Sequence, residues 1–249
     1  MAGSDTYIRQ YRPYDLPQVH GLFFEGLVTG RGSVANFAKC RFLLKAPMVS
    51  AYLLSLCGAA VLCYLPHYDN VAGVLGFVLL ASGPAICIAI RRVIHNAFLG
   101  YVDQVLQQGD MRDIEAYYAF PAAFFVAVRR VGGDDKKDEN NEKVEEVLRM
   151  VGLEYDQKTH TAEVRRMIVS AAHRRRGLAA LLMRTLITYA ESVRGLDAIE
   201  LGTSEFQRGA RRLYEGLGWE LKKTEEEPSS FGKVMIWRLR RKVETKKRK

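Results

Sequence analysis

The fold is decided by the stretch Arg174-Arg175-Arg176-Gly177-Leu178-Ala179. The residues ahead of it, Glu163–Val169, predict a strand, and apolar side chains recur every three or four residues from Leu178 to Val193, which predicts a helix. A glycine turn that opens a helix directs unpaired backbone N–H groups outward at the positive end of the helix dipole. The turn therefore predicts a site for an anion such as a diphosphate. The alternative is an exposed basic helix cap with a packing glycine.

The segments around this stretch alternate between predicted strands and helices. Thr6–Arg12 alternates like a strand, and Asp15-Leu16-Pro17 is typical of a helix start. Further strands are predicted at 123–128, 145–153, 198–203, 219–221 and 234–237, with a helix from Ser204 to about Leu217. The predicted class is α+β, built on one mixed sheet flanked by helices.

Two uncharged runs of twenty residues, 46–65 and 71–90, interrupt this pattern. Asp69 is the only formal charge between Lys45 and Arg91. At about 1.5 Å per helical residue, each run spans roughly 30 Å, the thickness of a bilayer core. Buried helices of soluble proteins are the alternative, but two such runs in tandem favour a transmembrane helical hairpin.

The flanks of the hairpin predict its orientation. Lys39, Arg41 and Lys45 precede it and Arg91 and Arg92 follow it, while the connecting turn has no Lys or Arg. Because cationic flanks stay on the cytosolic side, both termini are expected there. The chain then divides into residues 1–45 with the first strand and helix, the membrane hairpin at 46–90, the remainder of the α+β domain at 91–237, and a basic tail at 238–249.

Charge and cysteine content exclude other classes of protein. The 249 residues carry a formal net charge of +9, but residues 238–249 contribute eight Lys or Arg against one Glu. This tail has no interleaved aromatic residues, so no nucleic-acid partner is predicted. The four cysteines form neither a secreted disulfide framework nor a CxxC metal spacing, and no metal site is expected.

The decisive stretch resembles a family signature when it is read with a second segment. Arg174 to Ala179 resembles the [QR]-x-x-G-x-[GA] motif of the GNAT superfamily of N-acetyltransferases, and Gln207 to Trp219 resembles its N-x-x-A-x-x-x-Y-x-x-x-G-[FW] segment. The resemblance covers the chain outside the hairpin. A hairpin that interrupts the domain after its first helix is similar to the camello-type (N-acetyltransferase-8-like) membrane enzymes. Gln207 departs from the Asn of many members.

The resemblance implies acetyl-CoA as co-substrate and assigns residues to it. Backbone N–H groups of the turn at 174–179 would hold the pyrophosphate, and the backbone of Met167, Ile168 and Val169 would hold the acyl and pantetheine arms. Gln207 stands at the pantetheine-binding position. Tyr214 stands at the position of the acid that protonates the departing thiolate, a role open to a phenol with a pKa near 10. The alternative for Tyr214 is packing on a helix face.

The resemblance also offers a general base. Glu163 lies fourteen residues before Gly177, the spacing of the catalytic glutamate in histone-acetylating members. Glu200, His160 and a water-mediated route are alternatives, and Glu163 could equally pair with Arg165.

The end of the chain, Lys246-Lys247-Arg248-Lys249, resembles the cytosolic dilysine signal that returns proteins to the endoplasmic reticulum. A basic tail resting on anionic lipid is the alternative. We therefore expect a protein of the endoplasmic reticulum membrane.

The predicted function is transfer of an acetyl group from acetyl-CoA to a primary amine, by direct attack in a ternary complex. A small amino-acid derivative such as a cysteine S-conjugate is the favoured acceptor. A protein-lysine acetyltransferase of the secretory pathway and a non-catalytic acetyl-CoA-binding adaptor remain alternatives. The sequence does not predict an oligomeric state.

Overall fold

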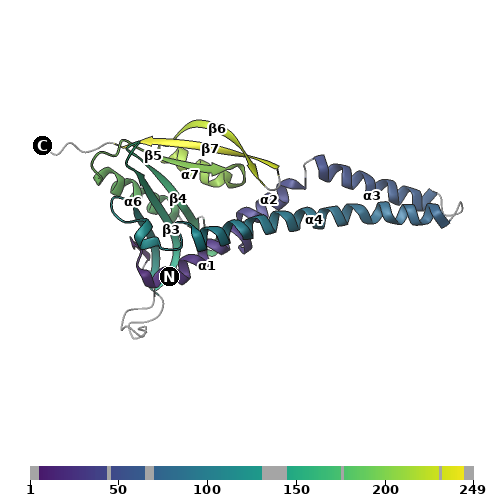
Figure 1. Cartoon of the computed structure of the whole chain (residues 1–249), viewed down its shortest axis with the longest axis horizontal. Coiled ribbons are helices and arrows are strands. Elements are labelled where there is room, and N and C mark those ends of the chain that lie inside the picture. The colour runs from purple at the N-terminus through teal and green to yellow at the C-terminus, as the bar shows by residue number, and fades with distance from the viewer. Residues whose placement is uncertain are drawn as a thin grey trace.

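The computed structural model describes residues 6–43, 46–64, 70–130, 145–174, 177–229 and 232–243. A seven-stranded sheet carries helices on both faces, and a pair of long helices extends away from it (Figure 1). The strands are β1 (Thr6–Gln10), β2 (Ala123–Arg130), β3 (Glu145–Asp156), β4 (Thr161–Val169), β5 (Ala198–Ser204), β6 (Glu220–Ser229) and β7 (Gly232–Lys242).

The strand order is β1-β2-β3-β4-β5-β7-β6. Strands β4 and β5 are parallel, and the other neighbouring pairs are antiparallel. The predicted mixed sheet flanked by helices is therefore confirmed. Its single parallel pair needs a crossover, which the helix α6 (Leu178–Ser192) supplies.

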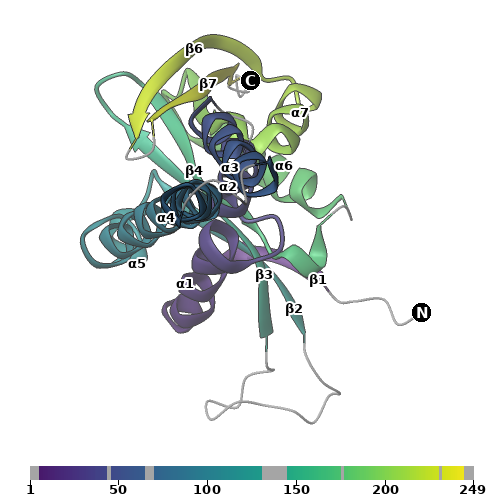
Figure 2. The same cartoon turned by 90° about the vertical axis from the view of Figure 1, so that its right-hand side faces the viewer.

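Helices lie on both faces of the sheet (Figure 2), and each face has its own apolar core. One face is covered by α6 and α7 (Arg208–Gly216), and the other by α1 (Leu16–Phe24) and the C-terminal part of α4 (Asn70–Gln108). The buried face of α6 consists of Leu182, Met183, Leu186, Ile187 and Ala190. Leu182 and Leu186 belong to the predicted stripe, but Leu181, which the stripe also includes, is 49% exposed. Burying one large aliphatic side chain contributes about 1.5–3 kcal/mol, so this face fixes α6 against the sheet.

The short elements are α5 (Ile114–Tyr117), three 3₁₀ turns and one π-helical turn. The 3₁₀ turns are η1 (Pro13–Asp15), η3 (Ala171–His173) and η4 (Glu205–Gln207), and the π turn is η2 (Glu25–Thr29).

The helical extension differs from the sequence prediction in two respects. A second helix, α2 (Val34–Phe42), separates α1 from α3 (Ala46–Tyr64), so the extension does not follow the first helix directly. The helix α4 is continuous from the extension into the domain, so the predicted boundary between residues 90 and 91 falls inside it. One long helix thus joins the catalytic domain to the extension.

The helix α4 is long and apolar enough to cross a membrane. Its most apolar 18 residues have a mean hydropathy of 2.2, and only 11% of them are buried. The shorter α3 packs along it, and the Ser55 hydroxyl donates a hydrogen bond to the Leu80 carbonyl at 3.1 Å. A Cβ at Gly58 would lie 2.6 Å from the Gly76 carbonyl oxygen, so small residues let the two backbones approach closely.

The predicted basic tail begins too early. Arg238–Lys242 form the end of β7 and pair with Ala198–Gly202 of β5. Alternation places the fully buried Leu239 side chain in the core and Arg238 and Arg240 on the other face, while Arg241, on the Leu239 side, donates to the Leu217 carbonyl. The dilysine at 246–247 lies outside the described residues.

Candidate active site

Strands β4 and β5 diverge and open a cleft in the sheet. Thr161–Val164 pair with Ala198–Leu201, but β4 continues unpaired with β5 to Val169, and β5 continues to Ser204 paired with β7 alone. The backbone edge of β4 beyond Val164 is therefore free of its parallel neighbour. A β-strand edge of this kind offers N–H and C=O groups to an extended ligand.

The cleft has a volume of about 630 Å³ and draws its walls from several elements. The diverging strands contribute Arg165–Ile168 and Gly202–Ser204. The remaining walls come from the helices α1, α2, α4 and α7, from the turns η2 and η4, and from the β6–β7 hairpin. Their residues are Phe23, Leu27, Val34, Phe98, Tyr101, Phe206, Gln207, Tyr214, Glu227, Pro228, Ser229, Val234, Ile236 and Arg238. Most of these side chains are apolar or aromatic, as in a site for a small organic ligand.

The glycine turn lies at the start of α6, as predicted. Gly177 is the N-cap residue and has a φ of 74°, which favours glycine. A Cβ at this position would meet no atom within 4 Å, so the space in front of the helix N-terminus is open. Leu178 and Ala179 form the first helical turn, whose N–H groups are free to bind an anion.

The side chain of Arg174 is already engaged in the fold. Its Nη1 donates to the carbonyls of Arg31 and Gly32 at 2.9 and 3.0 Å, and its Nε donates to the Val169 carbonyl at 3.3 Å. Arg174 therefore ties the loop before α2 to the end of β4. Arg175 and Arg176, the other predicted diphosphate ligands, lie outside the described residues.

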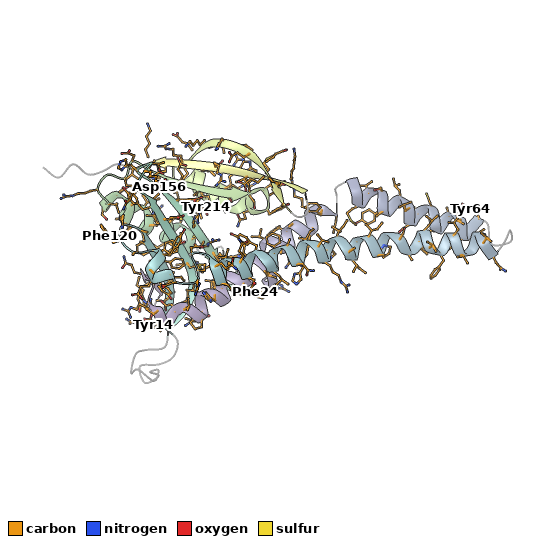
Figure 3. All side chains as sticks on the ribbon, viewed as in Figure 1. Tyr14, Phe24, Tyr64, Phe120, Asp156 and Tyr214 are labelled. Carbon is orange, nitrogen blue, oxygen red and sulfur yellow. The ribbon has the colours of Figure 1, made fainter. Side chains whose placement is uncertain are left out.

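Tyr214 lines the cleft from α7 and lies within the sheet domain, far from Tyr64 at the tip of the extension (Figure 3). Its side chain is only 5% exposed, and its ring contacts Trp219 at 6.1 Å between centroids. Burial raises the pKa of the Tyr214 phenol above its ordinary value. The hydroxyl consequently stays protonated at neutral pH, as a proton donor requires.

Gln207 and the predicted acyl-binding residues also reach the cleft. Gln207 is the N-cap residue of α7, and its side-chain oxygen accepts a hydrogen bond from the Thr203 hydroxyl at 3.2 Å. Met167 and Ile168 line the cleft, whereas the Val169 carbonyl is used by Arg174. Of the predicted site residues, Met167, Ile168, Gln207 and Tyr214 thus meet in one cleft, although Met167 and Tyr214 are 47 positions apart in the sequence.

Known acetyltransferases are similar to this chain over the region that contains both motifs and over most of its length. The family described as "Acetyltransferase (GNAT) family" matches residues 94–219. A probable N-acetyltransferase family 8 member 5 from Mus musculus is 31% identical over 220 residues, which cover 86% of this chain and 83% of that protein.

The chain belongs to the acetyltransferase (GNAT) family. The N-acetylaspartate synthetases of Danio rerio and Homo sapiens are similar to it, with 28% and 29% identity over 87% of this chain. The chain spans 67% and 63% of their lengths, about two thirds. The predicted likeness to the camello-type branch and the reaction class, acetyl-CoA-dependent N-acetyl transfer, are confirmed.

The candidate bases of this GNAT site differ in their positions. Glu163 lines the cleft, but its carboxylate pairs with Arg165 Nε at 3.0 Å and lies 3.6 Å from Arg238 Nη1. Glu200 accepts from Lys222 at 2.8 Å and faces a neighbouring depression rather than the cleft. His160 lies in the turn before β4 and is not part of the cleft wall. Glu163 is therefore the best placed of the three.

Several cleft residues of the GNAT site were not predicted from the sequence. Phe98 and Tyr101 belong to the C-terminal part of α4, and Phe206 belongs to the 3₁₀ turn before α7. The local sequence of a helix carries no signal for the residues at which it contacts a strand distant in the chain, so these contacts could not be predicted. Within the described ranges, no cluster of three His, Cys, Asp or Glu side chains has the arrangement of a metal site.

Proposed function

We propose that this chain is a membrane-anchored N-acetyltransferase in which a primary amine attacks the thioester of acetyl-CoA directly, in a ternary complex. The observation that supports this is the composition of one cleft. It contains Tyr214, the free edge of β4 at Met167 and Ile168, and an apolar wall that belongs to neither sequence motif. Donor and acceptor can therefore meet in the same cavity, without a covalent intermediate on the protein.

We further propose that the acceptor is a small amino-acid derivative with an apolar substituent, such as a cysteine S-conjugate. The acceptor side of the cleft presents Phe23, Leu27, Phe98, Val234 and Ile236. Such a wall binds an apolar group by the area that it removes from water.

The arginines of the cleft favour this acceptor over a dicarboxylate. Arg166 is bonded to Asp110, and Arg165 pairs with Glu154 and Glu163. Arg238 pairs with Glu225 and Glu227. Because each cation already has a carboxylate partner, a second carboxylate on the acceptor would have to displace one of them. The name of the N-acetylaspartate synthetases is thus not carried over to this chain.

The proposed reaction moves two protons. The acceptor ammonium loses a proton, to Glu163 or through water, and its nitrogen then attacks the thioester carbonyl. The N–C bond forms, and Tyr214 donates its phenolic proton to the sulfur as the C–S bond breaks. The nitrogen then gives up its second proton, which leaves the neutral amide and restores the Tyr214 phenol through water. Backbone N–H groups on the edge of β4 would stabilise the oxyanion that develops between these steps. The backbone N–H groups at the start of α6, with Gln207 farther along, would hold the diphosphate and pantetheine parts of acetyl-CoA.

The membrane anchor is proposed to be the hairpin of α3 and α4. Its support is the exposed apolar surface of the two helices, which includes Leu53, Leu56, Val74, Phe77 and Ile88, each more than half exposed. In the proposed topology both termini are cytosolic, since Arg91 and Arg92 stand where α4 leaves the apolar stretch. Residence in the endoplasmic reticulum rests on the C-terminal lysines.

Topology can be tested with single cysteines in the full chain in sealed microsomes. Cysteines placed at Asn70 and at Gln108, in a background without the four native cysteines, should differ in labelling by an impermeant maleimide. The proposed topology expects Gln108→Cys to react in intact vesicles and Asn70→Cys only after detergent is added. Labelling of both in intact vesicles contradicts a spanning hairpin.

The function is tested by release of the coenzyme A thiol from acetyl-CoA. The full chain in detergent or nanodiscs is given S-benzylcysteine, aspartate, spermidine or a lysine peptide. Turnover with S-benzylcysteine that exceeds turnover with aspartate supports the proposal. Turnover with the lysine peptide alone would identify a protein acetyltransferase, and acetyl-CoA binding without any turnover would identify an adaptor.

A further inference from the structure

The cleft wall contains an ion pair that neither motif uses. Arg166 of β4 binds Asp110, in the turn that follows α4, through two of its nitrogens. Arg166 Nε lies 2.8 Å from Asp110 Oδ2, and Nη2 lies 2.6 Å from Oδ1. The third nitrogen, Nη1, donates to the Tyr101 hydroxyl of α4 at 2.7 Å. The guanidinium is therefore committed to α4 and its following turn.

The backbone of Arg166 has a conformation that is rare for a residue with a side chain. Its φ is 55°, in the left-handed region. Ile168 pairs with Met150 and Arg165 pairs with Gly152, so that Val151 of β3 stands opposite both Arg166 and Met167. This is a β-bulge with Arg166 as its left-handed residue. It lies directly before Met167 and Ile168, the predicted acyl-binding segment.

The other partner of the pair is deeply buried. The Asp110 side chain is 2% exposed and accepts a further hydrogen bond from the Tyr118 hydroxyl at 2.5 Å. Burial opposes ionisation of Asp110, but the hydrogen bonds from Arg166 and Tyr118 outweigh it and lower its pKa. Asp110 is therefore charged at neutral pH, and the pair is a full ion pair with bidentate geometry.

Tyr118 is itself held against the strand that faces the bulge. A Cβ at Gly152 would lie 2.6 Å from the Tyr118 ring, so only a glycine in β3 leaves room for this ring. Gly152 is also the residue of β3 at which the register with β4 shifts. Asp110, Tyr118 and Gly152 thus form a buried chain of contacts that ends on the bulge.

We propose that the Asp110–Arg166 ion pair is a positioning device that holds the β4 bulge, so that the backbone of Met167 and Ile168 is fixed in register with the acyl group. The proposal rests on the proposed function, in which this backbone contacts the thioester. A left-handed residue other than glycine persists only where its surroundings enforce it, and the bidentate contact to Asp110 provides that enforcement. Arg166 and Asp110 act through Met167 and Ile168 and touch no reacting atom.

The proposal predicts different effects on kcat and on the Kd of coenzyme A. The diphosphate site at the start of α6 and Gln207 at the start of α7 are different elements from the bulge, so loss of the ion pair should leave most of the binding free energy of coenzyme A intact. Stabilisation of the developing oxyanion depends on donor positions within a few tenths of an ångström, so kcat should fall.

The most informative variant is Arg166→Gly. Glycine adopts a positive φ without strain, so this variant keeps the preferred backbone conformation and loses the ion pair together with the guanidinium contacts to Tyr101 and Phe23. We expect kcat to fall at least about tenfold, with the Kd of coenzyme A within about twofold of the wild-type value. Arg166→Lys keeps the charge but not the bidentate contact, and its kcat should lie between those of the wild type and Arg166→Gly. Arg129→Gln, which removes an ion pair with Glu146 on the same sheet, is the matched control and should leave both constants unchanged.

Hydrogen exchange of the β4 peptide gives a second readout that does not depend on turnover. In Arg166→Gly the peptide covering 161–169 should exchange faster than in the wild type, while the α6 peptide should not change. Wild-type kcat and unchanged β4 exchange in Arg166→Gly would overturn the proposal. A parallel loss of kcat and coenzyme A binding would instead assign the pair to folding alone and would also overturn it. An inactive wild type would refute the proposed function, and the exchange data would still decide whether the pair holds the bulge.

Discussion

Gly26 of the π turn η2 lies against Ile168 of β4, so closely that a Cβ at position 26 would stand 2.6 Å from Cγ2 of Ile168. The turn after α1 therefore packs closely against β4, the strand that lines the cleft. A π turn inserts one residue into a helix and often occurs beside functional sites. Here it brings a glycine, in place of a larger residue, opposite the acyl-binding segment.

Gly26→Ala should displace Ile168. We expect a loss of about 1–3 kcal/mol in the free energy of unfolding, the usual cost of overpacking, with a several-fold fall in kcat. Gly21→Ala is the matched control, since a Cβ at Gly21 in α1 would meet no atom within 4 Å. It should stabilise the protein by about 0.5–1 kcal/mol, because alanine favours a helix. Chemical unfolding and steady-state kinetics check both values, and equal behaviour of the two variants would contradict the close contact.

Gly177→Ala should impair binding of acetyl-CoA. The variant must adopt the φ of 74°, which costs about 1–2 kcal/mol in stability, and its methyl group would occupy the open space before α6. We expect KM for acetyl-CoA to rise about tenfold, which corresponds to a loss of about 1.4 kcal/mol in binding free energy.

Gly195→Ala is the control for backbone strain alone. Gly195 has a φ of 78° and similarly open surroundings, but it lies in the turn between α6 and β5. It should lose the same stability as Gly177→Ala and retain the KM of the wild type. A rise in KM in both variants would show that the effect reflects stability and not the anion site.

Tyr214→Phe should slow catalysis without unfolding the protein. Phenylalanine keeps the packing against Trp219, so the melting temperature should change little. Removal of a general acid lowers kcat by a factor on the order of 10²–10⁴. Because burial raises the pKa of Tyr214 above its ordinary value of 10.0, the wild type should show no alkaline loss of kcat from this group up to about pH 9. An unchanged kcat in Tyr214→Phe would contradict the role of Tyr214 as the acid. An alkaline limb near pH 8 that disappears in Tyr214→Phe would contradict the raised pKa of Tyr214.

Much of the sheet and its covering helices could be predicted from the sequence, because the patterns that indicate these elements are local. The apolar run of β2 and the glycine turn before α6 each depend on residues close in the chain, and both appear where they were predicted. The end of β7 was misjudged because a strand with cations on one face has the same composition as a basic tail. Only its pairing with β5 distinguishes the two.

The site could be predicted only where a motif fixes it. Gly177, Gln207 and Tyr214 stand at motif positions, and the last two reach the cleft. The engagement of Arg174 by carbonyls of the loop before α2 could not be predicted, since that loop is more than 140 positions away. The same holds for Asp110 and Arg166, which are 56 positions apart and meet because α4 ends beside the bulge.

Acid should weaken the anchorage of β1 to β3. Arg9 binds Asp15 at the start of α1 and Glu145 of β3, and Tyr7 donates a further hydrogen bond to Glu145. Burial disfavours the Glu145 carboxylate, but the hydrogen bonds from Tyr7 and Arg9 outweigh it and lower its pKa below the ordinary 4.5. A lowered folded-state pKa means that the stabilisation is complete above about pH 4.5 and is lost as the pH falls through the folded-state value.

Glu145→Gln should therefore destabilise the protein most at neutral pH, by about 1.5–3 kcal/mol, the range for hydrogen bonds to a charged group. The difference from the wild type should shrink below about pH 4.5, because the wild-type carboxylate is then protonated as well. Glu146→Gln removes the neighbouring, more exposed pair with Arg129 and should cost no more than about 1 kcal/mol at any pH. Unfolding of the detergent-solubilised chain by urea between pH 3 and 7 measures all three curves. A Glu145→Gln curve that stays parallel to the wild type down to pH 3 would show that Glu145 does not supply the acid-sensitive contact.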